Sequence, residues 1–225
     1  MSDADAKGPR RYESPKRRQQ ARATRRAIVE AGRSLFLSRG YGGTTIEAIA
    51  GEAGVAVQTV YAVFGSKPHI LRSVLDVAVT GEDAPAPPLL DPDAMRVIGL
   101  EPDPARRVRM FAALVGDVLG RTAAVTQVAR EAAAADPEMA QMWRAMQDSR
   151  TGGMAEAARV LVGDGDGDGD GLPVRPLDEI RDLLWVLCGP EVHQLFVAER
   201  LWTPERYEEW LVSAIEPVVN PRPPG

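Results

Sequence analysis

The stretch that decides the fold of this chain is Ile46–Phe64, with the sequence IEAIAGEAGVAVQTVYAVF. Its first half repeats apolar residues with the 3.6-residue period of a helix, which predicts one short helix. Ala50 is small enough for a second helix to approach, Gly54 tolerates the positive φ of a tight turn, and Val60 supplies an inward apolar side chain. We therefore predict a helix–turn–helix, whose second helix would present its outward side chains to DNA bases.

The residue spacing alone is equally compatible with a plain helical hairpin inside a core. The charge distribution distinguishes this alternative from a DNA-binding helix–turn–helix. Residues 1–75 contain 13 Lys and Arg against 6 Asp and Glu, whereas the rest of the chain contains 14 against 26. The net charge of −5 is therefore the sum of a basic N-terminal segment, residues 1–75, and an acidic remainder. A basic segment beside a helix–turn–helix favours double-stranded DNA as a partner. Residues 1–16 are expected to be a disordered basic tail.

The chain from about Thr24 to Leu75 resembles the N-terminal domain of the tetracycline-repressor (TetR) family of bacterial transcription regulators. The matching pieces keep the family's order and spacing: 28-IVEAGRSLF-36, 40-GYGGTTI-46, 48-AIA-50, 53-AGV-55, 59-TVY-61 and 64-FGSK-67. The resemblance implies an all-α fold, with a DNA-binding domain joined to a larger helical domain that binds an effector and dimerises. The chain departs from the family at Ala56, where Ser or Thr usually caps the recognition helix, and at Val57, where Lys or Arg is common.

Two kinds of DNA contact are expected in such a domain. Phosphates would be bound by the basic first helix and by residues at helix starts, and bases by the outward face of the recognition helix. The residues predicted to contact DNA are Arg17, Arg18, Arg22, Thr44, Thr45, Val57, Gln58, Thr59, Tyr61, Ala62 and Lys67.

The proline-rich segment 81–88 predicts a break between two domains. We place the DNA-binding domain, with a fourth linking helix, at residues 17–80, and an effector-binding and dimerisation domain at 81–225. Strand signals are almost absent from the second part. Helix starts are predicted at three pairs in which a capping residue precedes proline, namely Asp103–Pro104, Asp136–Pro137 and Thr203–Pro204.

The last two predicted helices carry strong apolar stripes, from Leu177 to about Arg200 with a kink at Gly189–Pro190, and from Thr203 onward. These stripes either close the core of one subunit or form an interface between two. The resemblance favours a homodimer through these helices, and we expect Leu195 and Leu211 to lie in its interface. Two recognition helices about one DNA turn apart would then match a palindromic operator.

The second domain is rich in Met and Trp, which suits a pocket for an unknown small apolar or aromatic effector, although the same residues suit any helical core. The predicted lining is Phe111, Leu114, Val118, Trp143, Met146, Leu184 and Trp185. The resulting hypothesis is a repressor that a ligand releases from DNA. The alternative is a ligand-independent DNA-binding regulator or architectural protein.

Other classes of function find little support in the sequence. Only His69 and His193 could act as neutral-pH bases, and no triad, metal cluster or phosphate loop is evident, so we expect neither an enzyme nor a cofactor nor a metal. The Gly–Asp alternation of 163–171 lacks the final Glu of a calcium loop and is interpreted as a loop. The single cysteine, Cys188, suits a reducing cytoplasm, and no signal peptide or membrane span is predicted.

Overall fold

The computed structural model describes residues 15–80, 90–163 and 175–220, and these residues form helices with no strand among them. The prediction of an all-α fold is therefore confirmed. Four helices make the N-terminal part: α1 (Pro15–Arg39), α2 (Ile46–Glu52), α3 (Val57–Phe64) and α4 (Lys67–Thr80). The basic tail predicted for residues 1–16 lies outside the described residues, except that Pro15 and Lys16 already belong to α1.

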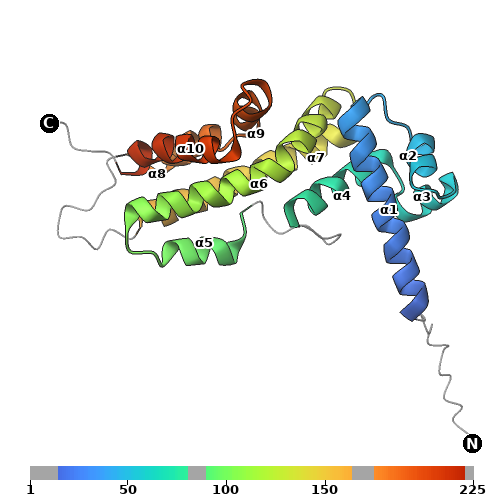
Figure 1. Ribbon diagram of the computed structural model, residues 1–225, viewed down its shortest axis with the longest axis horizontal. Coiled ribbons are helices and arrows are strands. Elements are labelled where there is room, and N and C mark those ends of the chain that lie inside the picture. The colour runs from blue at the N-terminus through green and yellow to red at the C-terminus, as the bar shows by residue number, and fades with distance from the viewer. Residues whose placement is uncertain (1–14, 81–89, 164–174, 221–225) are drawn as a thin grey trace, which may run out of the picture.

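The body is built around two long helices, α6 (Pro104–Ala133) and α7 (Pro137–Val162), which run alongside each other in Figure 1. The short α5 (Pro92–Gly99) packs on one side of them, and α8 (Leu177–Leu187) and α10 (Pro204–Val219) cover another. Helices α1–α3 lie at the opposite end of the molecule from α5, α8 and α10, with α4 between them and the body (Figure 1).

Three of the body helices begin at the predicted pairs. Asp103 accepts a hydrogen bond from the Ala105 amide, Asp136 from the Glu138 amide, and Thr203 from the Arg206 amide. In each case the following proline occupies the first helical turn, where its missing N–H would have had no intrahelical partner. The predicted helix starts are confirmed because this local chemistry is decided within four residues.

The predicted kink at Gly189–Pro190 is a full interruption. Helix α8 ends at Leu187, a single turn α9 (Pro190–His193) follows, and Gln194–Glu199 forms a π-helical segment. Proline has no N–H and disfavours helical backbone in the preceding residue, so α8 cannot continue through this pair.

Two clusters of buried apolar residues form the core. The first joins α1–α4 to the far ends of α6 and α7 through Val125, Val128 and Met139. The second lies within the body and is formed by α5–α8 and α10. Helices α1–α4 therefore share a buried core with the C-terminal end of α6 and the N-terminal end of α7, and are joined to the body by packing as well as by the chain.

Leu211 corrects one expectation about the dimer. Its side chain is fully buried in the second core cluster of its own subunit, as are those of Ile215 and Tyr207. The inward stripe of α10 therefore closes the monomer core. Leu195, by contrast, is 52% exposed.

Candidate DNA-binding surface and effector cavity

The turn between α2 and α3 has the geometry that the sequence predicted. Thr45 is the N-cap of α2, and its hydroxyl oxygen accepts a hydrogen bond from the Ala48 amide at 3.1 Å. Gly54 has a φ of +66°, and the Val55 amide donates to the Ala50 carbonyl at 3.0 Å. Because Ala50 and Val60 are both buried, the two helices are held in contact by small and β-branched side chains.

The outward face of α3 carries the predicted base-contacting residues. Gln58, Tyr61 and Ala62 are exposed, whereas Val57 and Thr59 are half-buried and pack partly against the domain. This arrangement leaves an amide, a phenol and small side chains at the surface that would face the major groove.

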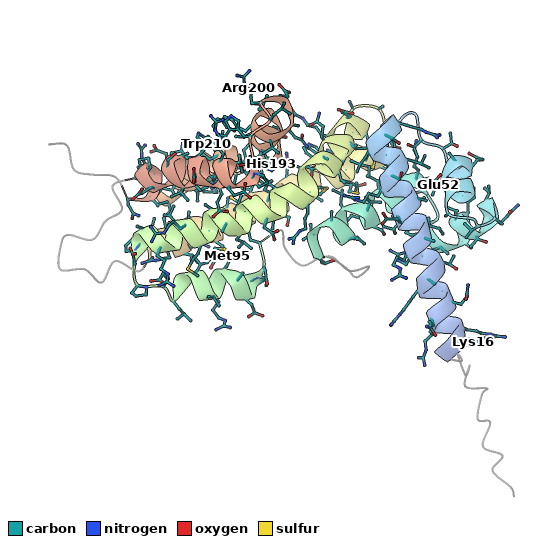
Figure 2. All side chains as sticks on the ribbon, in the orientation of Figure 1. Lys16, Glu52, Met95, His193, Arg200 and Trp210 are labelled. Carbon is teal, nitrogen blue, oxygen red and sulfur yellow. The ribbon has the colours of Figure 1, made fainter. Side chains whose placement is uncertain are left out.

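Basic residues on α1 lie next to the recognition helix. Arg17, Arg18 and Arg22 are exposed, and a groove between α1 and α3 is lined by Arg17 and Arg22 together with Thr59. Lys16 marks the projecting end of α1 in Figure 2. The fold therefore joins the basic side chains and the recognition helix in one surface, as a duplex with its phosphates requires.

Two residues predicted to contact phosphate are engaged inside the protein. Thr44 is fully buried, and its hydroxyl is within hydrogen-bond distance of the carbonyls of Gly40 (2.8 Å) and Leu35 (3.1 Å), so its side chain does not face DNA. The Lys67 ammonium donates to the carbonyls of Tyr41 and Thr44 at 2.9 and 3.0 Å. Burial lowers the pKa of Lys67. Both side chains therefore form hydrogen bonds that hold the α1–α2 loop in place. Their positions at the starts of helices did not indicate this role.

Ala56 leaves the N-terminus of α3 without a side-chain cap. We expect Ala56→Ser to raise the stability by about 1 kcal/mol, because the hydroxyl oxygen would accept a hydrogen bond from a free amide of the first turn. Thermal unfolding measures the gain as a rise in Tm of roughly 2–4 °C. Ala62→Ser, on the exposed middle of the same helix, is the control and should give no rise.

A set of polar contacts connects the DNA-binding domain to the α6–α7 turn. The Tyr41 hydroxyl donates to the Asp136 carboxylate at 2.8 Å. On the neighbouring side, the His69 Nε2 lies 3.6 Å from a Glu138 oxygen. The hydrogen bond from Tyr41 is the main reason that the pKa of Asp136 is lowered. Contacts of this kind fix the angle between the DNA-binding helices and the body.

Tyr41→Phe should make the protein less sensitive to acid. Because the pKa of Asp136 is lower in the folded protein than in the unfolded chain, where it is about 3.9, ionisation of Asp136 stabilises the fold. This contribution is complete at pH values above the unfolded-state pKa and is lost as the pH falls through the folded-state pKa. Wild type should therefore lose stability between about pH 5 and pH 2 more steeply than the variant. At pH 7 the variant should be roughly 1 kcal/mol less stable, since Asp136 is largely solvated. Urea titrations across this range measure both effects, and Tyr61→Phe serves as an exposed control.

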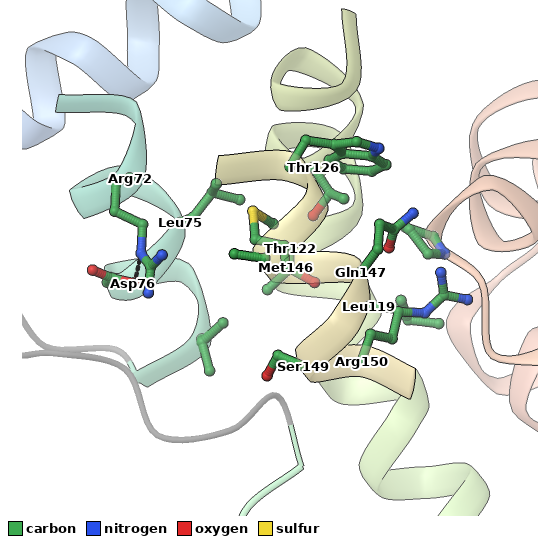
Figure 3. A pocket seen from close by; sticks show the side chains of 14 residues that line it. Arg72, Leu75, Asp76, Leu119, Thr122, Thr126, Met146, Gln147, Ser149 and Arg150 are labelled. Carbon is green, nitrogen blue, oxygen red and sulfur yellow. Dashed lines mark hydrogen bonds and ion pairs between the residues drawn. The ribbon is translucent and has the colours of Figure 1, made fainter. Parts of the chain in front are cut away.

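A cavity of about 310 Å³ lies where α4 meets α6 and α7. Figure 3 shows Arg72 and Asp76 of α4 on one side, Arg150 of α7 on the other, and Thr122 and Met146 between them. The residues lining it are Arg72, Leu75, Asp76, Val79, Leu119, Thr122, Thr126, Trp143, Ala145, Met146, Gln147, Ser149, Arg150 and Pro190.

Of the seven residues predicted to line a pocket, Trp143 and Met146 line this cavity. Phe111, Val118 and Leu184 are buried, and Phe111 and Leu184 belong to the second core cluster, against which Leu114 and Trp185 pack. The cavity is also more polar than expected. Sequence reasoning missed α4 altogether, although Thr122 and Thr126, polar residues one turn apart on the inward side of α6, were a usable signal.

The family comparison concerns the segment that contains the helix–turn–helix. Residues 28–74 match the family model described as bacterial regulatory proteins, tetR family. The N-terminal segment of the chain is therefore similar to that of the TetR family of regulators. Among curated proteins none matches this chain.

Solved structures show the same fold along nearly the whole chain. NalD of Pseudomonas aeruginosa, described as the secondary repressor of the MexAB-OprM multidrug efflux pump, is 21% identical, with a TM-score of 0.63 over 88% of this chain and 95% of NalD. FadR of Bacillus subtilis, solved with stearoyl-CoA, is 15% identical, with a TM-score of 0.62 over 87% and 97%. PfmR of Thermus thermophilus is 18% identical, with a TM-score of 0.59 over 89% and 97%.

Metal-binding clusters and membrane-spanning helices are absent from the described part of this chain. Within residues 15–80, 90–163 and 175–220, no cluster of three His, Cys, Asp or Glu side chains could hold a metal ion. No helix in the same ranges is both long and apolar enough to cross a bilayer. The Gly–Asp loop predicted for 163–171 lies outside the described residues beyond Gly163.

Proposed function

We propose that the chain is a TetR-family regulator, a homodimeric repressor which binds a palindromic operator and is released when a small molecule occupies the cavity at α4. Its α3 helices would lie in successive major grooves, and the arginines of α1 would bind the flanking phosphates.

One observation carries the proposal: the cavity takes part of its wall from α4. Leu75 and Val79 line the cavity, while Ile70, Leu71 and Val74 of the same helix are buried in the core of the DNA-binding domain. A molecule that separates α4 from α6 and α7 therefore moves the helices that carry α3. Release follows only if the ligand prefers the conformation in which the two recognition helices no longer match the operator.

The dimer is supported by apolar side chains that a single subunit leaves exposed near its C-terminal end. Val186 of α8 is 54% exposed, and Leu195 of the π-helical segment is 52% exposed. The same part of the chain holds half-buried Phe196 and Trp210, whose rings pack at a tilt of 49° with centroids 4.4 Å apart. Pairing this surface with its copy would bury apolar area and fix the spacing of the two α3 helices.

Selection of bound sites from fragments of the source genome tests the proposal. We expect an inverted repeat whose half-sites lie about one helical turn apart. A screen of small molecules against that operator complex then tests release, and a ligand should raise the Tm as binding theory requires. Binding to DNA without any sequence preference would contradict the proposal, as would a selected site with a single half-site.

Gln58→Ala should weaken binding to the selected operator by about 1–3 kcal/mol and relax one base position in each half-site, because a glutamine amide can pair bidentately with adenine. Repeating the selection with the variant measures the change in preference. Gln141→Ala, an exposed glutamine of α7 in the body, is the control. If variant and wild type select identical sites, Gln58 contacts no base.

A further inference from the structure

Four side chains near the α8–α9 bend hold buried polar atoms that have no hydrogen-bond partner among the described residues. These atoms are Nε and Nη1 of Arg150, Nε1 of Trp185, Nδ1 of His193 and the hydroxyl of Tyr207. Buried polar atoms almost always have partners, so a group of orphans within one region requires an explanation.

The four side chains form a connected group. The guanidinium carbon of Arg150 lies 4.2 Å from the centre of the Trp185 ring, and the rings of His193 and Tyr207 are 4.8 Å apart. Both pairs lie at the end of α8. Cys188, which follows α8, is buried in the same core cluster as Tyr207, and a Cβ atom added at Gly189 would lie 3.3 Å from Nη2 of Arg150.

The unpartnered atoms are alike in that each can serve as a hydrogen-bond donor. Arginine and tryptophan nitrogens can only donate hydrogen bonds, and a tyrosine hydroxyl can donate one. Burial lowers the pKa of His193 and so favours the neutral ring, which can present an N–H at either nitrogen. What this group lacks is an acceptor.

Arg150 connects this group to the cavity. The residue is 5% exposed and lines the cavity on the side opposite Arg72 (Figure 3). Its Nη2 donates to the Trp185 carbonyl, and no carboxylate in the described ranges lies within ion-pair distance of it. Burial lowers the pKa of Arg150, and the charge of Glu191, which opposes this effect, is paired with Arg130 at 3.1 Å.

The other arginine of the cavity is already neutralised. Arg72 and Asp76 form an ion pair at 2.9 Å within α4. Among the residues that line the cavity, the positive charge without an ion-pair partner is therefore that of Arg150, and apolar side chains such as Met146 and Leu75 line the same cavity.

We propose that the effector of the cavity is a carboxylic acid with an apolar body, whose carboxylate binds Arg150. This inference rests on the proposed ligand-responsive function and adds the chemical class of the ligand. Nε and Nη1 of Arg150 are shielded from solvent, so the guanidinium turns toward the cavity when the acid binds, and a bidentate pair with the carboxylate replaces its contact with Trp185. The movement changes the surroundings of the Trp185 ring.

Titration calorimetry with matched pairs of compounds tests the head group directly. The pairs are decanoate with decanamide and 2-naphthoate with 2-naphthamide, which share a body and differ in charge; decylamine is the cationic comparison. At least one acid should bind about tenfold or more tightly than its amide, because a charge-assisted pair is lost in the amide. The titrations contain no DNA, so they are independent of operator release.

Variants locate the effect. Arg150→Met keeps an apolar stem and should remove the preference for acid over amide, whereas Arg150→Lys should keep part of it. Arg107→Met is the control, because Arg107 is a half-buried arginine of the body that donates to the Val160 carbonyl and does not line the cavity. Tryptophan emission should change on binding of the acid, and Trp185→Phe should remove part of that change.

Several outcomes would overturn the proposal. These are equal affinity for acid and amide, a preference for decylamine, no binding of either acid, or an Arg150→Met variant that still prefers the acid. If Arg150→Met does not fold, the acid and amide comparison on wild type decides alone. An acid that binds through Arg150 yet leaves operator binding unchanged would support the carboxylate site and contradict the proposed release mechanism.

Discussion

Leu211→Glu is expected to unfold the body of the protein, because it places an unpaired carboxylate at a position with no exposed surface. The loss is on the order of 5 kcal/mol, comparable with the whole stability of many domains. Circular dichroism should show loss of helix or of a cooperative transition at 25 °C, and DNA binding should disappear with it.

Val186→Glu is the matched partner of that variant, since the same charge enters an apolar surface that is 54% exposed in one subunit. The variant should keep its helix content and melt cooperatively, but light scattering should show a monomer whose operator affinity is lower by several orders of magnitude. A Val186→Glu dimer with full operator affinity would place the interface elsewhere. A folded Leu211→Glu protein would contradict the core described for α10.

Ala50→Gln should abolish specific DNA binding while the body stays folded. The residue is 2% exposed at the contact of α2 with α3, so an amide there is both too large and without partners. Overpacking and an unsatisfied amide together cost about 2–6 kcal/mol, enough to separate the two helices. Electrophoretic mobility shift measures the loss of DNA binding, and a ligand titration by tryptophan emission measures whether the cavity survives.

The neighbouring position supplies the control for Ala50→Gln. Gly51 lies in the same helix, is exposed, and a Cβ atom added there would meet nothing within 4 Å. Gly51→Gln should therefore keep the fold of the domain and near-normal DNA binding. If both variants bind DNA alike, the α2–α3 contact does not depend on a small residue at position 50.

Local chemistry explains which features could be predicted from the sequence. Helix starts at Asp103, Asp136 and Thr203 depend on a cap and a proline that are adjacent in sequence, and the positive φ of Gly54 depends on a single missing side chain. Such features need no knowledge of distant parts of the chain.

The cavity could not be predicted in the same way. Apolar phase shows that Phe111 and Leu184 point inward, but a packed core and a cavity both require inward residues. Whether space remains depends on how α4, α6 and α7 cross, which no single helix encodes. The prediction that the Thr44 side chain contacts phosphate was wrong for a related reason. A threonine before a helix can cap it or turn inward, and here Thr45 is the N-cap of α2, whereas the Thr44 hydroxyl bonds the Leu35 carbonyl near the end of α1.

The wall that α4 contributes to the cavity has a consequence for dose and response. If the conformation of one helix affects both operator binding and ligand binding, the two affinities are linked. Bound operator then lowers the affinity for the ligand by the same factor by which bound ligand lowers the affinity for the operator. A promoter with a tighter operator would therefore need a higher effector concentration for induction. Under the proposed release mechanism, genes with weaker operators would therefore be switched on before genes with stronger ones as the effector accumulates.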